Sequence, residues 1–227
     1  MAKSCSSEPA HAEAARFAAW HDYYNEKRIG QQWFQVHLLK GLPVRRVLEV
    51  GPYLGLVTAF LDNAGYAVAT LDHGPRKFSH PTGEHIDASL LDLAPDKIRG
   101  FDLILCSETL EHLPWEKVGD VLRCFRDSGA RYLITSVPYE GLQFRLLLDW
   151  NLHKFRQSFA FRKGRSLRTF RPRPQADGHY WEVGYRGYSL KTWEEQLEGA
   201  GWRIAKRDFT APRRSVFHLL ANASDGC

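Results

Sequence analysis

Two acidic residues and two glycines near the start of the chain have the types and spacing of a nucleoside-binding site. The run VLEVGPYLG carries Glu49 near the end of an apolar segment and then turns through Gly51 and Gly55. Asp72 ends the next apolar segment. Glycine lets the backbone approach a ligand where a Cβ would collide, and a strand-end carboxylate can accept hydrogen bonds from both hydroxyls of a ribose. The pattern therefore predicts a nucleoside site.

The charge of Glu49 distinguishes between two kinds of nucleoside cofactor. A dinucleotide would need the spacing G-x-G-x-x-G and a helix N-terminus for its pyrophosphate, and GPYLGLVTA lacks that spacing. A carboxylate just before the turn would repel a pyrophosphate and attract the cationic amino group of a methionine moiety. We therefore expect S-adenosylmethionine, with an ordinary strand-to-helix turn as the alternative.

A second stretch, CSETLEHLPWEKV, gathers groups that can hold a metal or move a proton. Glu108, Glu111 and His112 stand at positions i, i+3 and i+4, which share one face of a helix. Carboxylates and an imidazole suit a divalent ion. Without a metal, Glu108 or His112 is the candidate general base, which helps only when the acceptor is a hydroxyl that must lose a proton. Capping or substrate orientation by these residues is the alternative.

Alternating strands and helices are needed to position these residues. Strand-like runs occur at 44–50, 66–72, 84–87, 101–107, 131–137, 202–209 and 215–221, with helical patterns at 54–65, 115–129 and 189–201. The alternation predicts an α/β fold: a doubly wound, mostly parallel seven-stranded sheet covered on both faces. No helix separates the last two strands, so we expect an antiparallel C-terminal hairpin, together with an N-terminal helical cap and an insertion after the fifth strand.

The length and composition fit a single domain. The 227 residues, 44% of them hydrophobic, suffice for one sizeable core. We expect a single domain over 1–227, with a helical cap (9–40), a cofactor-binding core (44–138), a substrate-side insertion (139–187) and a last helix with the strand hairpin (188–221). Neither a secretory signal nor a transmembrane run of apolar residues is evident, which predicts a cytoplasmic protein.

These motifs together resemble the class I, Rossmann-like, seven-stranded S-adenosylmethionine-dependent methyltransferases, over roughly residues 44–138 and 189–221. The resemblance rests on LEVGPYLG, TLD, FDLILCSETLEHLP, YLITSVP and LEGAGWRI. It implies that the turn after the first strand wraps the methionine part of the cofactor, that the acid after the second strand holds the ribose, and that an acid near the third meets the adenine amino group. The implied cofactor-binding residues are Glu49, Gly51, Tyr53, Gly55, Asp72, Asp87 and Ser107, with Asp92 as the alternative to Asp87.

One position departs from this family's pattern. Members often have a third glycine midway in the turn, where this chain has Tyr53. Its side chain would narrow the cofactor site or stack near it. Trp20, Tyr23 and Tyr24 of the N-terminal cap are further candidates for contact with the cofactor or the acceptor.

The sequence E-x-x-E-H also resembles the metal-dependent 2′-O-methyltransferases that modify small-RNA 3′ ends, and LEH occurs in quinone-biosynthesis O-methyltransferases. In the RNA group a second histidine comes from downstream, and DGHYWEVG offers His179 at a comparable place. The resemblance implies the metal ligands Glu108, Glu111, His112 and His179.

The insertion combines an apolar stripe with concentrated positive charge. An apolar residue recurs at helical spacing from Phe144 to Phe159, which predicts a helix that closes over the site, or alternatively a helix on a membrane surface. The segment from Lys154 to Arg173 holds eight basic residues and no acidic one. Without it, the net charge of +5 for the whole chain becomes −3 for the remaining residues. Such a segment could bind an anionic substrate or a nucleic acid, or could be a solvated loop.

The sequence thus predicts transfer of a methyl group from S-adenosylmethionine to an oxygen or nitrogen of a small-molecule acceptor, anionic or a glycoconjugate. The alternative is an RNA-directed methyltransferase or a non-catalytic nucleic-acid-binding module on the same fold. Peripheral membrane contact is a further possibility for the insertion.

Overall fold

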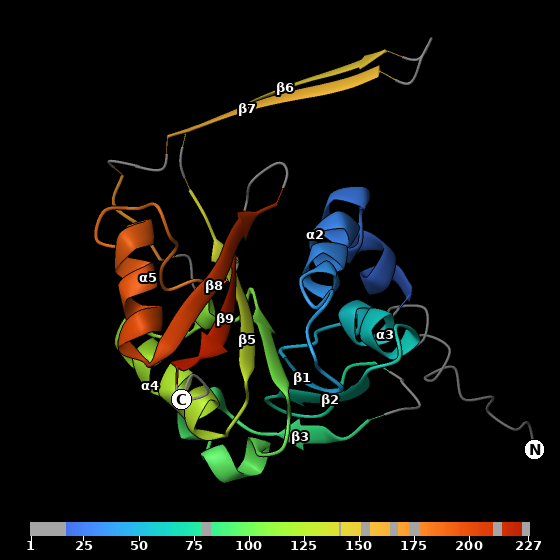
Figure 1. Cartoon of the computed structure of the whole chain (residues 1–227), viewed down its shortest axis with the longest axis vertical. Coiled ribbons are helices and arrows are strands. Elements are labelled where there is room, and N and C mark those ends of the chain that lie inside the picture. Colours follow the sequence, from blue (N-terminus) through green and yellow to red (C-terminus); the bar gives the residue numbers. More distant parts are fainter. Residues whose placement is uncertain are drawn as a thin grey trace, which may run out of the picture.

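A seven-stranded sheet forms the centre of the molecule (Figure 1). The computed structural model describes residues 17–78, 83–140, 142–150, 155–163, 168–172, 178–210 and 215–223. The strand order in the sheet is β3-β2-β1-β4-β5-β9-β8. The strands of the sheet are β1 (Arg46–Val50), β2 (Ala67–Asp72), β3 (His85–Asp87), β4 (Leu103–Ser107), β5 (Tyr132–Pro138), β8 (Trp202–Phe209) and β9 (Ser215–Asn222).

The pairing of these strands confirms the predicted fold class. The strands from β3 to β5 pair in parallel, whereas β9 is antiparallel to both β5 and β8. The chain runs outward from β1 to β3 and then returns to β4 on the other side of β1, so the strand order reverses between β1 and β4. In open α/β sheets the ligand crevice lies beyond the carboxyl ends of the strands at such a reversal.

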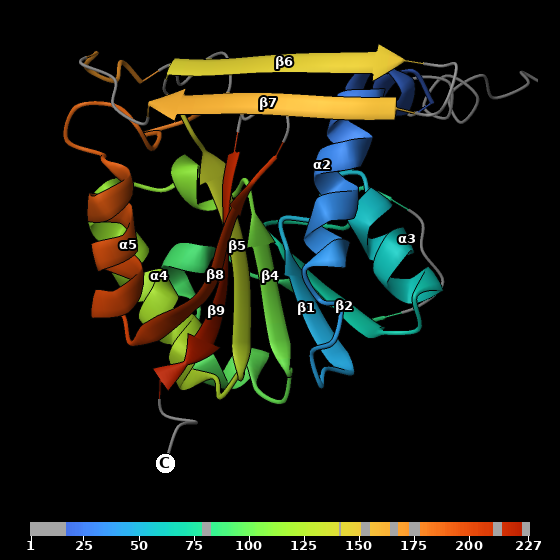
Figure 2. The same cartoon turned by 45° about the horizontal axis from the view of Figure 1, so that its top comes forward.

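Helices cover both faces of the sheet, as a buried parallel sheet requires. The helices α2 and α3 lie on one side and α4 and α5 on the other (Figures 1 and 2). Each side has its own apolar cluster, one including Val36, Val57 and Leu61, the other Leu122 and Leu197. The helices are α2 (Glu26–His37), α3 (Leu56–Asn63), α4 (Trp115–Asp127) and α5 (Leu190–Gly199), with short 3-10 turns η1 (Leu90–Asp92), η2 (Pro95–Ile98) and η3 (Leu110–His112).

Local sequence signals fix the ends of several helices. The side chain of Ser189 accepts a hydrogen bond from the Thr192 amide and so caps α5, as its sequence predicts. Gly65 and Gly129 follow α3 and α4 in the left-handed conformation that helix-terminating glycines adopt.

The N-terminal cap differs from the predicted continuous helix over 9–40. Residues 9–16 lie outside the described part of the chain, and residues 17–23 are helical. The helix then breaks at Tyr24, and Asn25 accepts a hydrogen bond from the Arg28 amide as the N-cap of α2. An asparagine competes for backbone hydrogen bonds, which favours a new helix start over continuation.

The insertion contains a β-hairpin, so the predicted apolar helix is wrong. Strands β6 (Leu142–Trp150) and β7 (Phe155–Lys163) pair along their whole length and lie beyond the carboxyl end of the main sheet (Figure 2). Every second residue from 142 to 150 is apolar, which is the period of a strand, and this alternation prevailed over the helical spacing. Leu152 and Lys154, included in the predicted stripe and basic segment, lie outside the described residues. Among the described residues, no helix is both long enough and apolar enough to span a bilayer.

Candidate functional site

The turn after β1 requires glycine at two positions. Gly51 and Gly55 have φ angles of 70° and 79°, in the left-handed region. A Cβ on Gly51 would lie 2.7 Å from Thr109 Oγ1, and one on Gly55 would lie 2.4 Å from the ring of Phe78. Glycine at these two positions therefore makes room for the side chains of Thr109 and Phe78 at the carboxyl end of β1, the end of the sheet where open α/β folds place their ligand crevice.

Tyr53 occupies the same turn in a conformation that suits glycine better. Its φ is 48°, and it is one of two non-glycine residues with positive φ in the described chain. Its ring lies 4.4 Å from the ring of Tyr23, centroid to centroid, and the ammonium of Lys77 lies 5.7 Å from its centroid. A positive φ is a conformation that glycine adopts more readily than tyrosine, and the contacts with Tyr23 and Lys77 hold the tyrosine in place.

Glu49 is buried beneath this turn. Its side chain is 5% exposed, and Oε2 accepts a hydrogen bond from Thr58 Oγ1 of α3. Burial raises the pKa of Glu49 to about 7, against the lowering effect of the Thr58 bond. The hydroxyl of Tyr24 accepts a bond from the Leu56 amide at the start of α3, and burial raises the pKa of Tyr24 to about 12. A carboxyl group whose pKa is close to neutral pH therefore lies under the glycine turn.

Two acids meet at the ends of the neighbouring strands. Asp72 and Asp87 are register partners at the carboxyl ends of β2 and β3. Asp72 Oδ1 accepts from the His73 amide and Asp87 Oδ1 from the Gly74 amide, both at 2.8 Å. These bonds fix both carboxyl groups at the crevice. Asp92, the alternative to Asp87, is exposed in η1.

The junction after β4 differs from the predicted helix face. Ser107 ends β4, and its Oγ is buried with no hydrogen-bond partner among the described residues. Glu108 has a φ of 51°, and its Oε1 accepts a hydrogen bond at 2.8 Å from Ser136 Oγ of β5. The following turn, η3, begins only at Leu110. Glu108 therefore lies outside the helical turn, and its prediction as a group on one helix face with Glu111 and His112 is wrong.

Three of the four predicted metal ligands do come together. One ligand atom from each of Glu111, His112 and His179 lies within 4.8 Å of the others. Glu111 is 0% exposed, and neither of its carboxylate oxygens has a hydrogen-bond partner in the described part of the chain. Burial, with the charge of Glu108 as a smaller cause, raises the pKa of Glu111 well above its usual value. A buried carboxylate without a partner is costly, so this group points to a ligand or a proton at the cluster.

A return segment after the insertion, residues 178–188, brings His179 to η3. The Tyr180 amide donates to Glu111 O, and Trp181 Nε1 donates to Leu113 O. Val183 then pairs with the end of β5 through an isolated parallel bridge to Tyr139. These contacts hold the segment against both η3 and the sheet, although it lies far from both in the sequence.

Glu182 belongs to this cluster and was missed by sequence reasoning. Its Oε1 lies 2.9 Å from His179 Nδ1, while His179 Nε2 lies 3.9 Å from Glu111 Oε1. A carboxylate on one imidazole nitrogen fixes the ring so that the other nitrogen faces the site. The spacing H-x-x-E in HYWE was the available signal.

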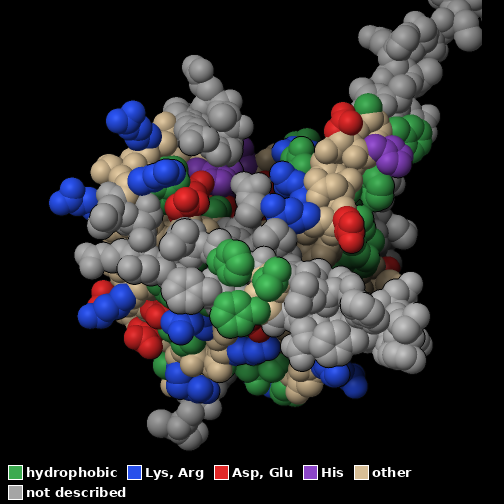
Figure 3. Space-filling model, turned by 90° about the horizontal axis from the view of Figure 1, so that it is seen from above, with side chains coloured by type: hydrophobic (Ala, Val, Ile, Leu, Met, Phe, Trp, Pro, Cys, Tyr) green, Lys and Arg blue, Asp and Glu red, His purple; other side chains and the backbone are tan. Residues whose placement is uncertain are grey.

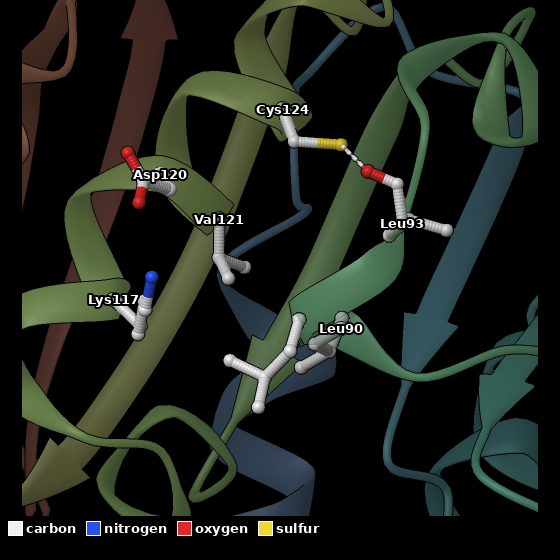
Figure 4. Close-up of a pocket in the computed structure, with 7 residues that line it drawn as sticks. Leu90, Leu93, Lys117, Asp120, Val121 and Cys124 are labelled. Carbon is white, nitrogen blue, oxygen red and sulfur yellow. Dashed lines mark hydrogen bonds between the residues drawn. The ribbon is translucent and has the colours of Figure 1, made fainter.

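A small hollow lies apart from these groups. About 100 Å³ in volume, it is lined by residues of the η1 region and α4, including Leu90, Val121 and Cys124 (Figure 4). Cys124 Sγ donates to Leu93 O at 3.1 Å. None of the residues predicted for the cofactor or the metal lines it.

Comparison with known proteins identifies the architecture. No protein-family model matches the chain, and no curated protein matches it either. Solved structures do match. The magnesium protoporphyrin IX methyltransferase of Synechocystis PCC 6803, with bound S-adenosylhomocysteine, shares 15% identity and a TM-score of 0.57 over 92% of this chain and 94% of that one.

Two further structures give similar values. The 1,6-didemethyltoxoflavin-N1-methyltransferase of Burkholderia thailandensis shares 14% identity and a TM-score of 0.55, over 98% of this chain and 92% of that one. The glycopeptide N-methyltransferase MtfA shares 13% identity and a TM-score of 0.56, over 88% and 91% of the respective chains. At such identities a structural match carries information about the fold. This chain has the class I S-adenosylmethionine-dependent methyltransferase fold.

Proposed function

We propose that the protein transfers a methyl group from S-adenosylmethionine to an oxygen or nitrogen atom of a small-molecule acceptor. The observation that carries the proposal is the left-handed glycine turn from Gly51 to Gly55 at the reversal of strand order, with Asp72 and Asp87 at the adjacent strand ends. Structural neighbours with the same fold bind S-adenosylmethionine or S-adenosylhomocysteine.

Each of these residues has a physical role in the proposal. The turn admits the methionine part of the cofactor close to the backbone, and the ionised form of Glu49 attracts its amino group through the turn. Asp72 accepts hydrogen bonds from the ribose hydroxyls, and Asp87 from the adenine amino group. Ser107 offers a buried hydroxyl at the end of β4. Once the cofactor is seated, alignment of the acceptor with the methyl carbon supplies most of the rate enhancement.

A divalent metal ion fits the cluster beside β4. Its fit rests on Glu111, whose two buried oxygens have no hydrogen-bond partner in the described chain and which a cation would keep ionised. His112 and His179 supply neutral nitrogens, and Glu182 orients His179. A bound ion would lower the pKa of an acceptor hydroxyl. In this proposal Glu108, engaged by Ser136, orders the junction and is not a ligand, and His112 is a ligand rather than the base.

The proposed acceptor is anionic or a glycoconjugate. The support is the concentration of basic residues in the insertion, which lies beyond the same end of the sheet as the site (Figure 1). Neighbours named for a glycopeptide and for magnesium protoporphyrin IX illustrate how widely acceptors vary on this fold.

Isothermal titration calorimetry with S-adenosylmethionine and S-adenosylhomocysteine tests the function. We expect saturable binding of both at one site per chain. Binding of neither would overturn the proposal. Incubation with a methyl-labelled donor and small-molecule extracts, followed by mass spectrometry, then identifies the acceptor by its labelled product.

A further inference from the structure

The β6–β7 hairpin has one apolar face. Its register pairs Phe144 with Phe161, Leu146 with Phe159 and Trp150 with Phe155. Because residues directly opposite in a hairpin lie on one face and alternate residues share it, these pairs occupy positions of a single face. The apolar residues at its positions are Leu142, Phe144, Leu146, Leu148, Trp150, Phe155, Phe159 and Phe161.

Part of this face is open to solvent. Phe144, Leu146 and Phe159 are 55%, 46% and 62% exposed, and the direct pairing of Leu146 with Phe159 makes them neighbours. Figure 3, which views the molecule from above, displays hydrophobic side chains on this side with Lys and Arg side chains around them. A contiguous exposed apolar patch on a folded protein marks an interaction surface.

The charge of the insertion decides between the possible occupants. The described residues of 142–172 include Arg145, Arg156, Arg162, Lys163, Arg168 and Arg171, against a single acid, Asp149. Two copies meeting through this face would bring two such positive segments together, which repel. A nucleic acid would satisfy the charge, and its bases could stack on Phe144 and Phe159, but the exposed Leu146, paired directly with Phe159, offers a base no ring to stack on. An anionic lipid surface satisfies both the charge and the aliphatic and aromatic residues.

We propose that the apolar face of this hairpin docks onto an anionic membrane surface. The side chains of Phe144, Leu146 and Phe159 enter the boundary between headgroups and acyl chains, while the positive charge of the same segment attracts the lipid phosphates. The hairpin lies beyond the carboxyl end of the main sheet (Figure 2), so docking turns the crevice of the proposed cofactor site toward the membrane.

Sedimentation with lipid vesicles tests this surface. We expect the protein to pellet with phosphatidylcholine vesicles that contain phosphatidylglycerol, and to stay in solution with phosphatidylcholine alone. Added salt should weaken the binding because it screens the charges. The double variant Phe144→Ser/Phe159→Ser should lower the partition coefficient by about tenfold or more, because it removes two inserted rings.

Controls separate this result from misfolding and from other partners. The variant Leu91→Ser removes a comparably exposed leucine (52%) in η1 and should bind vesicles as the wild type does. Circular dichroism should give the same folded signal for all variants. The proposal is overturned if wild-type protein stays in solution with anionic vesicles. It is also overturned if the double variant still binds anionic vesicles. The same holds if the variant binds vesicles normally but has lost either a dimer seen by light scattering or binding to polyuridine, because the face would then be a dimer interface or a nucleic-acid site.

Discussion

At the scale of single residues, the environment of Glu49 predicts a pH dependence for cofactor binding if Glu49 attracts the cofactor's amino group as proposed. Its pKa lies near 7 because the carboxyl group is buried, so it loses its charge as the pH falls through neutrality. The protonated form cannot attract the amino group of the cofactor. We expect calorimetry to give an affinity for S-adenosylmethionine that falls below pH 7, by up to about tenfold per pH unit.

The variant Glu49→Gln provides the control for this prediction. Glutamine can keep the bond with Thr58 but does not titrate. The affinity of this variant for S-adenosylmethionine should therefore be lower than that of the wild type at about pH 8, and should not change as the pH falls by about two units. The effect of pH on folding stability has the opposite sign to its effect on cofactor binding. Because burial raises the folded-state pKa from 4.5 to about 7, the contribution of Glu49 to stability is fully present below pH 4.5 and is lost as the pH rises through 7. Relative to Glu49→Gln, the wild type should lose about 3 kcal/mol of unfolding free energy across that interval.

Asp72 carries a second prediction at this scale. Its carboxyl group is held at the end of β2 by the His73 amide, where we propose that the ribose binds. The change Asp72→Ala should weaken cofactor binding by roughly 1.5–3 kcal/mol, the range for hydrogen bonds to a charged group. Calorimetry measures it, and Asp96→Ala in the exposed η2 turn is the matched control. Unchanged affinity in Asp72→Ala would show that the ribose binds elsewhere.

At the scale of elements, the return segment 178–188 determines whether the proposed metal ligands meet. Gly184 has a φ of 104°, and a Cβ there would lie 1.8 Å from the carbonyl oxygen of Glu140, just after β5. The segment can therefore pair with the sheet only when residue 184 has no side chain. His179 and Glu182 are carried on this segment, so their placement depends on the same close approach.

The change Gly184→Ala should displace the segment and weaken binding of Mn²⁺ by about tenfold or more, as loss of supporting contacts does at metal sites. Calorimetry with Mn²⁺ alone measures this without any methyl-transfer assay. Gly187→Ala is the matched control, because Gly187 also has positive φ but a Cβ added there would meet nothing within 4 Å. Equal losses in both variants would attribute the effect to backbone strain rather than to the position of His179. If wild-type protein takes up no divalent ion, the metal proposal fails.

At the scale of the whole molecule, the cofactor groups and the hairpin belong to different layers. The turn follows β1, and Asp72 and Asp87 end β2 and β3 of the main sheet, whereas β6 and β7 form a separate two-stranded sheet. Replacing residues 142–163 with a short glycine and serine linker should therefore leave affinity for S-adenosylmethionine unchanged and abolish vesicle binding. Calorimetry and sedimentation on the same sample check this. A loss of cofactor affinity would mean that the hairpin completes the cofactor site.

The sequence by itself determined the main sheet and its helices. Apolar runs of strand length, glycines after helices and the Ser189 cap are local signals, because each reflects the conformation of a few consecutive residues. The glycine turn and the strand-end acids Asp72 and Asp87 could be placed for the same reason: parallel strands bring their carboxyl ends to one edge.

Only the tertiary structure decided the rest. Phe144 to Phe159 fits both a helical and a strand period, and pairing between two strands settled which one formed. Several site contacts join side chains from distant elements. They include the hydrogen bond of Glu49 with Thr58, that of Glu108 with Ser136, and the cluster of Glu111 with His179 and Glu182. Sequence spacing cannot specify such contacts, because they arise from packing between elements and not from the conformation of any one of them.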